Sequence, residues 1–266
     1  MLGMIDTGLS DSVVLVTGAH RNIGREIALA FAEQGAAVAV HYYAGNSSGL
    51  PEGVEAGHYV GDARAAEETV ARLREAGAPD ACAVAGDLGA PDAPRALLDA
   101  VEAWLGPAGV LVNNAAHTEV PDGVLDLTAE SLHRNYTVNT FAPALLTAEL
   151  ARRSPAGAAV VNISTDAARA FSGQLGYGTS KAALEAFTRA AAIDLGPRGV
   201  RVNAVAPGPV QTGWMSPELI DRVLPDIPLR RVGTPRDIAD AVVFLASRQA
   251  TWITGQVIQV AGGHVL

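Results

Sequence analysis

Short apolar runs alternate with longer amphipathic segments along most of the chain. Runs rich in Val, Leu, Ile and Ala predict strands that are buried on both faces. These runs lie at 13–16, 37–40, 81–85, 110–112, 160–165, 200–205 and 255–260. Segments with helical spacing of apolar residues lie between them, at 25–34, 63–76, 93–105, 131–153, 178–195 and 235–246. The alternation predicts an α/β fold, with one doubly wound parallel sheet and helices on both faces.

Three segments stand outside this alternation. Residues 1–10 have neither the basic start nor the apolar core of a signal peptide, so we expect a loose N-terminal arm before a single domain at 11–266. Residues 44–62 are rich in Gly, Ser and Asn and have no period, which predicts a loop insertion. Residues 209–233 are apolar and interrupted by prolines, which predicts a flap on the substrate side of the site.

Composition narrows the classes of partner. A net charge of −9 over 266 residues argues against a nucleic-acid surface or an anionic membrane surface. No apolar run is long enough to cross a bilayer. Cys82 is the only cysteine, so no intrachain disulfide can form, and a reducing, cytoplasmic location is expected. No metal site is predicted.

The first strand leads into a glycine-containing turn and then into a helix. This layout places a helix N-terminus against a pyrophosphate. The spacing Gly-x-x-x-Asn-x-Gly has Asn22 where a middle glycine is usual, and Asn is the residue best able to replace Gly at positive φ. The alternative is an ordinary strand-to-helix turn. The residues expected to bind the nucleotide here are Gly18, His20, Arg21, Asn22, Ile23 and Gly24.

The end of the second strand bears on the choice of nucleotide. An acidic residue there would bind a ribose 2′-hydroxyl and indicate NAD. The strand runs instead into His41-Tyr42-Tyr43, with no acid, and Arg21 in the turn is placed to meet a 2′-phosphate. Both features favour NADP(H) over NAD(H). The alternative for Arg21 is a solvated surface charge.

Tyr177 and Lys181 form the strongest candidate for chemistry. Four residues apart in a predicted helix, their side chains share one face. A nearby cation favours the phenolate form and so lowers the pKa of the phenol toward working pH, where general acid–base catalysis is most efficient. Lys181 is also the only lysine in the chain. The alternative is a pair of unrelated side chains on a solvated helix face.

Polar residues at buried positions supply further candidates. Asn139 interrupts an apolar helical stretch, where an unpaired amide is costly, so it is expected to open the helix locally and hold a water. A satisfied buried Asn is the alternative. Asn113 and Asn114 end the fourth strand and can tie neighbouring strands together. Ser164 and Thr165 form a hydroxyl pair at the end of the fifth strand.

Together and in this order, these motifs resemble the short-chain dehydrogenase/reductase family, most nearly its 3-oxoacyl-(acyl carrier protein) reductase-like members. The resemblance covers about residues 11–263 and implies a Rossmann-type fold. It implies that Tyr177 is the general acid/base, that Lys181 assists it and binds ribose hydroxyls, and that Asn139 holds a water linked to Lys181. Ser164 would hydrogen-bond the substrate oxygen. Further cofactor-binding residues are implied at Asp87, Leu88, Asn113, Ala115, Tyr177, Lys181, Pro207, Gly208 and Val210.

Three departures from the family pattern bear on the site. Asn22 replaces the middle glycine of the turn, and Ala116 stands where the family usually has Gly. The third departure leaves open which residue supplies the substrate-side hydroxyl. Counting back from Tyr177 selects Ser164, whereas aligning the end of the fifth strand with the family's Ile-Ser-Ser selects Thr165. We favour Ser164, since geometry relative to the tyrosine is what catalysis needs.

The hypothesis from the sequence is an NADP(H)-dependent oxidoreductase that reduces a carbonyl, a ketone or 3-oxoacyl group, to an alcohol. Its partners would be a small-molecule carbonyl or alcohol and further copies of the chain, as a homotetramer or homodimer, with no nucleic acid and no membrane. One alternative is an NAD-dependent alcohol dehydrogenase using the same site. The other is a non-catalytic dinucleotide-binding regulator, which has no need to keep a complete Asn–Ser–Tyr–Lys set.

Overall fold

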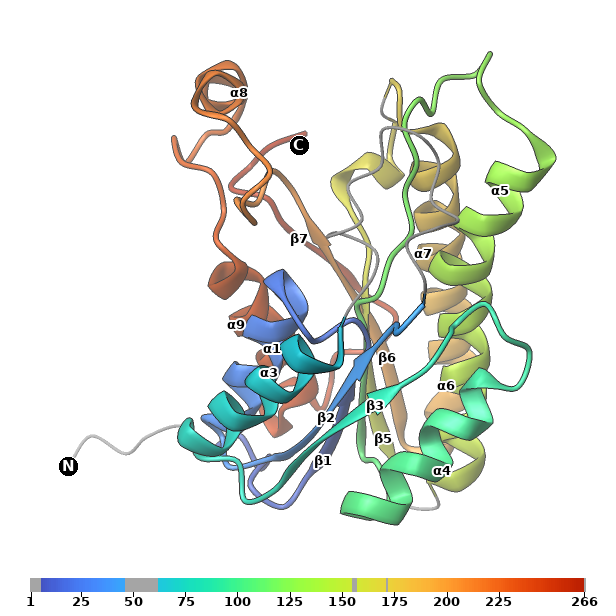
Figure 1. Cartoon of the computed structure of the whole chain (residues 1–266), viewed down its shortest axis with the longest axis vertical. Coiled ribbons are helices and arrows are strands. Elements are labelled where there is room, and N and C mark those ends of the chain that lie inside the picture. Colours follow the sequence, from blue (N-terminus) through green and yellow to red (C-terminus); the bar gives the residue numbers. More distant parts are fainter. Residues whose placement is uncertain (1–5, 46–61, 155–156, 171, 266) are drawn as a thin grey trace.

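The computed structural model describes residues 6–45, 62–154, 157–170 and 172–265, and it has a parallel sheet between two layers of helices (Figure 1). Within these described ranges, seven strands lie in the order β3-β2-β1-β4-β5-β6-β7. The order reverses between β1 and β4, which creates the switch point where open α/β sheets bind ligands. The strands are β1 (Val13–Val16), β2 (Ala37–Tyr42), β3 (Ala81–Ala85), β4 (Val110–Asn113), β5 (Ala158–Ile163), β6 (Val200–Pro207) and β7 (Val257–Val260).

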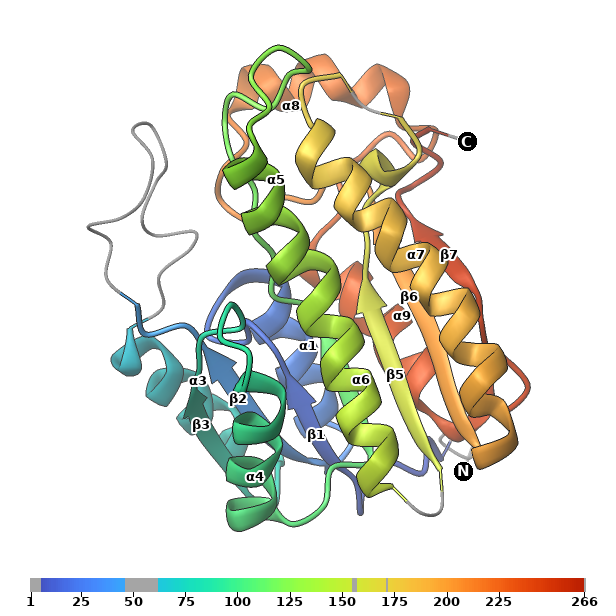
Figure 2. The same cartoon turned by 90° about the vertical axis from the view of Figure 1, so that its right-hand side faces the viewer.

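Helices cover both faces of the sheet. One layer consists of α1 (Asn22–Ala32), α3 (Ala63–Glu75) and α9 (Pro235–Ala246). The other consists of α4 (Ala93–Leu105), α6 (Ala142–Arg153) and α7 (Leu175–Leu195), and Figure 2 shows α6 and α7 side by side across β5. Within the described residues, the other two α-helices are α5 (Ala129–Tyr136) and α8 (Pro217–Val223). The π-helical turn η2 (Thr137–Phe141) joins α5 to α6, and four short 3-10 turns lie elsewhere in the same ranges.

The apolar strand runs explain why two layers form. In β1, Val14 and Val16 belong to the core beneath α1, α3 and α9, while Leu15 between them belongs to the core beneath α4 and α6. Because successive side chains of a strand point to opposite faces, a continuous apolar run needs cover on both. The predicted α/β fold with a doubly wound parallel sheet is therefore confirmed.

The structure corrects three expectations from the sequence. Strand β5 ends at Ile163, so the hydroxyl pair lies in the loop that follows and not in the strand. The flap at 209–233 contains α8, which the sequence analysis missed although Ser216 and Pro217 supply an N-cap and a favoured first residue. Residues 6–10, expected to form a loose arm, are packed on the domain, because Leu9 is buried. Most of the predicted 44–62 insertion lies outside the described residues.

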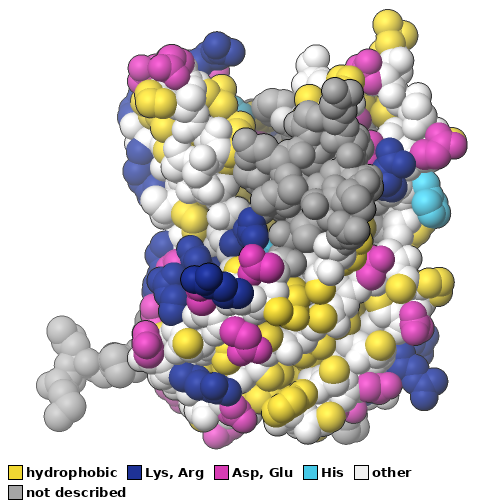
Figure 3. Space-filling view, viewed as in Figure 1, with side chains coloured by type: hydrophobic (Ala, Val, Ile, Leu, Met, Phe, Trp, Pro, Cys, Tyr) yellow, Lys and Arg dark blue, Asp and Glu magenta, His cyan; other side chains and the backbone are white. Residues whose placement is uncertain are grey.

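Surface charge and helix length both concern the predicted lack of nucleic-acid and membrane partners. On the part of the face in Figure 3 that is not grey, acidic and basic side chains are intermixed. Within the described residues, no helix has the length and apolar character that a membrane span requires.

Candidate active site

A cavity of about 220 Å³ opens at the carboxyl ends of the strands. It is lined by the first turn of α1, by the ends of β5 and β6 and the loops after β4, β5 and β6, and by one face of α7, so it lies at the switch point of the sheet. The lining residues are Ile23, Asn114, Ala116, Ile163, Ser164, Thr165, Tyr177, Lys181, Pro207, Gly208, Val210, Thr212 and Trp214.

Tyr177 and Lys181 both line this cavity from α7, as their spacing predicts. The Lys181 Nζ lies 5.9 Å from the centroid of the Tyr177 ring. The lysine is almost fully buried, and its Nζ donates a hydrogen bond to the backbone oxygen of Ile163 at 2.7 Å. Burial lowers the pKa of Lys181 to about 7, because the charged ammonium is poorly solvated there. The pair therefore has a cation that titrates near neutral pH beside a phenol.

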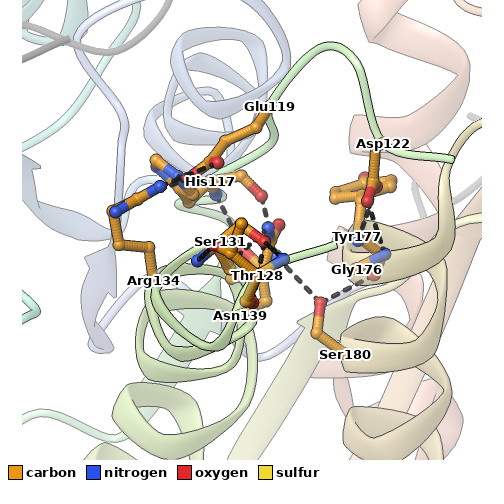
Figure 4. Close-up of polar contacts among 11 residues, drawn as sticks. His117, Glu119, Asp122, Thr128, Ser131, Arg134, Asn139, Gly176, Tyr177 and Ser180 are labelled. Carbon is orange, nitrogen blue, oxygen red and sulfur yellow. Dashed lines mark hydrogen bonds and ion pairs between the residues drawn. The ribbon is translucent and has the colours of Figure 1, made fainter. Parts of the chain in front are cut away.

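Asn139 occupies the π-helical turn η2 between α5 and α6, which confirms the predicted interruption of that helix. Its Oδ1 accepts from the backbone N–H of His117 at 2.8 Å, and its Nδ2 donates to the His117 oxygen at 2.8 Å and to Ser180 Oγ at 3.0 Å (Figure 4). Both amide protons are thus used within the protein. Asn139 joins the loop after β4 to helix α7, and a water held by this side chain would have to donate to Oδ1.

The loop after β4 also carries a buried carboxylate. Glu119 accepts from Arg134 Nη2 at 3.0 Å and lies 2.7 Å from His117 Nε2 (Figure 4). The hydrogen bond from Arg134 holds the pKa of Glu119 below its usual value. Since Arg134 belongs to α5, this ion pair fixes the loop to the helix that follows it.

The two hydroxyls after β5 have different surroundings. Ser164 is buried, and its Oγ donates to Glu185 Oε1 at 2.7 Å. Thr165 is only partly buried, and its Oγ1 accepts from the N–H of Ala167 at 3.2 Å. Both residues line the cavity, and each hydroxyl proton points at a carboxylate, but the bond from Ser164 to Glu185 is short whereas Thr165 Oγ1 donates to Asp166 Oδ1 only at 3.4 Å. A hydrogen bond of that length is weak, so the Thr165 hydroxyl is the more easily redirected to a ligand.

The glycine turn has the geometry that the sequence predicts. Gly18 and Asn22 have φ values of 64° and 51°, so Asn22 does take the left-handed conformation. Gly24 is needed for a different reason: a Cβ there would lie 2.3 Å from the Gly18 oxygen and 2.5 Å from Asn114 Nδ2. The first turn of α1 can therefore approach the sheet closely, which leaves room for a phosphate at its N-terminus.

Two buried histidines lie beside this turn. The Nδ1 of His41 accepts from the Gly18 N–H at 3.2 Å, and its Nε2 lies 3.2 Å from the Gly86 oxygen. Burial lowers the pKa of His41 to about 4, so the ring is neutral at pH 7 and carries its proton on Nε2. His41 therefore braces the end of β2, at the position where NAD-binding proteins carry an acid.

His20 supports the fit of a nucleotide to this turn. Its side chain is 7% exposed, and among the described residues neither ring nitrogen has a hydrogen-bond partner. Burial lowers its pKa to about 4. A buried polar ring without partners is costly unless a ligand satisfies it. The turn thus combines a helix N-terminus, a close glycine contact and a polar group that lacks a partner.

The other predicted cofactor residues differ in placement. Pro207, Gly208 and Val210 line the cavity with Tyr177. The side chain of Asn113 instead donates to Asn162 Oδ1 at 2.8 Å within the sheet, and Ala115 donates its N–H to Thr17 Oγ1 at 3.0 Å.

Beyond β3, the two predicted residues differ in what they present to a ligand. The Leu88 side chain packs in the core beneath α4. Asp87 is exposed, and its Oδ1 accepts from the Gly89 N–H at 2.8 Å, which leaves acceptor capacity on the carboxylate for a ligand. Contact between Leu88 and a nucleotide would therefore have to use backbone atoms. The Asn113 side chain keeps one acceptor, because its Oδ1 has no hydrogen-bond partner among the described residues.

The sequence analysis missed two carboxylates that support the site. Glu185 binds Ser164, and Asp122 accepts hydrogen bonds from the backbone N–H groups of Gly176 and Tyr177. The spacing of Glu185, four residues after Lys181, was a usable signal because it puts the two on one helix face. Asp122 lies in Val-Pro-Asp-Gly, which is typical of a turn and contains no sign of a distant partner.

A switch-point cavity, a glycine turn and a Tyr–Lys pair on one helix define a class of dinucleotide-binding oxidoreductases with a Rossmann-type fold. The chain belongs to the short-chain dehydrogenase/reductase family, which confirms the resemblance. A family model described as enoyl-(acyl carrier protein) reductase matches residues 50–264. The glucose and ribitol dehydrogenase homolog of Oryza sativa subsp. japonica is 35% identical over 276 residues, covering 97% of this chain and 87% of that protein.

Two solved structures extend the comparison. The promiscuous reductase LugOII, which catalyses keto-reduction at C1 during lugdunomycin biosynthesis, is 37% identical with a TM-score of 0.84, covering 97% of this chain and 99% of that chain. The angucycline C-6 ketoreductase LanV with bound NADP is 32% identical with a TM-score of 0.84, covering 97% and 96%. The whole fold is therefore shared with ketoreductases.

Proposed function

We propose that this protein is an NADP(H)-dependent carbonyl reductase. The observation that carries the proposal is the convergence of Tyr177, Lys181 and a hydroxyl-bearing loop on one cavity next to Gly208. A proton donor, a cation and a second hydrogen-bond donor around one open space are what a carbonyl oxygen needs as it becomes an alkoxide. The similarity to LugOII and LanV, both ketoreductases, supports the same reaction class.

NADP(H) is the proposed cofactor. Gly18, Asn22 and Gly24 would hold its pyrophosphate at the N-terminus of α1, and His20 and Arg21 would face its adenosine phosphate. At the end of β2, His41 offers a neutral ring whose nitrogens are both engaged with backbone, so it places no negative charge against a 2′-phosphate. LanV was solved with NADP bound, which is consistent with this choice.

When bound, a reduced nicotinamide supplies the hydride. In our proposal the Tyr177 hydroxyl donates its proton to the carbonyl oxygen as negative charge develops there. The Lys181 ammonium, close to the Tyr177 ring, favours the phenolate that remains. One of its three N–H donors is used by the Ile163 oxygen, so two remain for ribose hydroxyls and the phenol.

Thr165 is our candidate for the second donor to the substrate oxygen, in place of the Ser164 favoured from the sequence. Thr165→Val keeps the shape and removes the hydroxyl, and we expect it to lower kcat by about 10-fold or more, since one hydrogen bond to a charged oxygen contributes about 1.5–3 kcal/mol. Ser164→Ala should lower kcat less, because its hydroxyl donates to Glu185. Steady-state rates of both variants with one ketone test the assignment, and the reverse order of losses would restore Ser164.

The proposed activity is tested with a panel of neutral ketones and aldehydes, following the absorbance of NADPH or NADH. We expect reduction with a clear preference for NADPH. Arg21→Ala should raise KM for NADPH by about 10-fold or more and leave KM for NADH little changed, because a lost charge-assisted contact to a phosphate removes about 1.5–3 kcal/mol. A wild-type protein that reduces no carbonyl with either nucleotide would refute the proposed function.

A further inference from the structure

Helix α7, which carries Tyr177 and Lys181, begins without a local cap. Its N-cap residue, Gln174, makes no side-chain capping hydrogen bond. The first N–H groups of a helix have no partner within the helix and need one elsewhere. In a buried position this need is strict, because an unsatisfied N–H costs about 1–3 kcal/mol.

One residue from a distant loop accepts hydrogen bonds from the first three N–H groups of α7. The backbone oxygen of Asp122 accepts from the Leu175 N–H at 3.0 Å. Its carboxylate Oδ1 accepts from Gly176 at 2.7 Å and Oδ2 accepts from Tyr177 at 3.0 Å (Figure 4). Asp122 is buried and lies between β4 and α5. Its negative charge at the positive end of α7 is favourable.

Gly176 is matched to this carboxylate. A Cβ at this position would lie 3.0 Å from Asp122 Oδ1 and 3.1 Å from Asn135 Nδ2. Gly176 does not have the positive φ that would call for glycine on conformational grounds. The absence of a side chain at 176 is therefore explained by the space that the carboxylate occupies.

The peptide groups of Tyr177 are held on both sides. Its N–H is bound by Asp122, and its oxygen accepts from Ser180 Oγ at 2.6 Å. Ser180 Oγ in turn accepts from Asn139 Nδ2, which also binds the backbone of His117. Figure 4 shows these contacts joining the loop after β4 to the first turns of α7.

We propose that Asp122 is a positioning residue for catalysis: its carboxylate fixes the first turn of α7 and thereby the Tyr177 hydroxyl. This inference rests on the proposed function, since it assigns the placement of the proposed general acid. Proton transfer needs donor and acceptor within hydrogen-bond reach. A misplacement of about 1 Å can lower a rate by about 100-fold.

Asp122→Asn is the first test. The amide can accept one of the two N–H groups through its oxygen but presents its own N–H₂ to the other, so the turn should shift. We expect kcat for carbonyl reduction to fall at least about 10-fold, with the dissociation constant for NADPH changed by less than about twofold. Asp126→Asn is the matched control, because Asp126 is exposed in the same loop and its carboxylate, among the described residues, accepts only from the Gly123 N–H. It should leave kcat within about twofold.

Gly176→Ala provides a second route to the same displacement and keeps the inference testable if Asp122→Asn fails to fold. It should also lower kcat, because the new Cβ pushes against the carboxylate. The double variant, Gly176→Ala with Asp122→Asn, should have a kcat little lower than that of the more severe single variant. This is expected for two residues that act through one contact. A normal kcat in the folded Asp122→Asn protein, or losses that multiply in the double variant, would overturn the inference.

A readout without turnover separates this inference from the proposed function. The ionisation of Tyr177 is obtained by ultraviolet difference titration of the protein against its Tyr177→Phe variant. We expect Asp122→Asn to move that ionisation toward the behaviour of free tyrosine, since the phenol would lie farther from Lys181. An unchanged titration would count against Asp122 even in an active enzyme. A shifted titration in a protein that reduces no carbonyl would support the positioning role while the proposed function failed.

Discussion

Tyr177→Phe should lower kcat for carbonyl reduction by about 10²–10⁴-fold, the usual contribution of general acid catalysis. The substitution removes one oxygen and leaves the ring beside Lys181 in place, so the cavity keeps its shape. In the described part of the chain, the phenol is the one hydroxyl of α7 that lines the cavity. Loss of NADPH absorbance measures the rate, and quenching of protein fluorescence measures binding of the nucleotide, which should change little.

Tyr136→Phe is the matched control for this prediction. Tyr136 ends α5, and its ring centroid lies 6.3 Å from that of Phe141, away from the residues that line the cavity. Removing its hydroxyl should leave kcat within about twofold. If Tyr177→Phe kept a near-normal rate while Tyr136→Phe also did, the proton would have to come from another group, and Tyr177 would lose its proposed role.

The fold was predictable because its signals are local. Each strand of a doubly wound sheet is covered on both sides, so a run such as Val13–Val16 has to be apolar throughout. The turn after it was equally readable, since only a few residue types tolerate the φ of Gly18 and Asn22. The spacing of Tyr177 and Lys181 predicted a shared helix face without knowledge of the rest of the chain.

The unpredicted parts of the site depend on contacts between distant segments. Sequence spacing placed Ser164 and Thr165 next to each other but could not show which hydroxyl Glu185 would engage. Asp122 looks like an ordinary turn residue, and its carboxylate acquires a role only when the fold brings α7 against it. The same holds for His41. Its ring joins two different loops, because it contacts the backbone of Gly18 in one and of Gly86 in the other.

Lys181→Met should have opposite effects on activity and on stability. The variant keeps an unbranched side chain of similar length and removes the charge, so carbonyl reduction should fall by at least about 100-fold, within the range for lost acid–base assistance. Its free energy of unfolding should rise, because an apolar side chain replaces an ammonium that is fully buried. The shift in the pKa of Lys181 from 10.5 to about 7 corresponds to a penalty of roughly 5 kcal/mol in the folded state.

The pH dependence of that gain has a definite sign. Since the pKa of Lys181 is lower in the folded protein, the unfolded chain binds the extra proton between pH 7 and 10.5, and wild-type stability from this group increases with pH over that window. The stability advantage of Lys181→Met should therefore be largest at or below pH 7 and shrink toward pH 10.

Urea unfolding of both proteins at pH 6.5 and 9.5 measures this difference, with Arg189→Met, which removes an exposed charge from the same helix, as a control that should show little difference at either pH. A less stable Lys181→Met at pH 6.5, or an advantage that does not change with pH, would mean that the lysine charge is compensated in the folded protein. In that case Lys181 would stay charged at pH values well above 7, and burial would not be what sets its pKa.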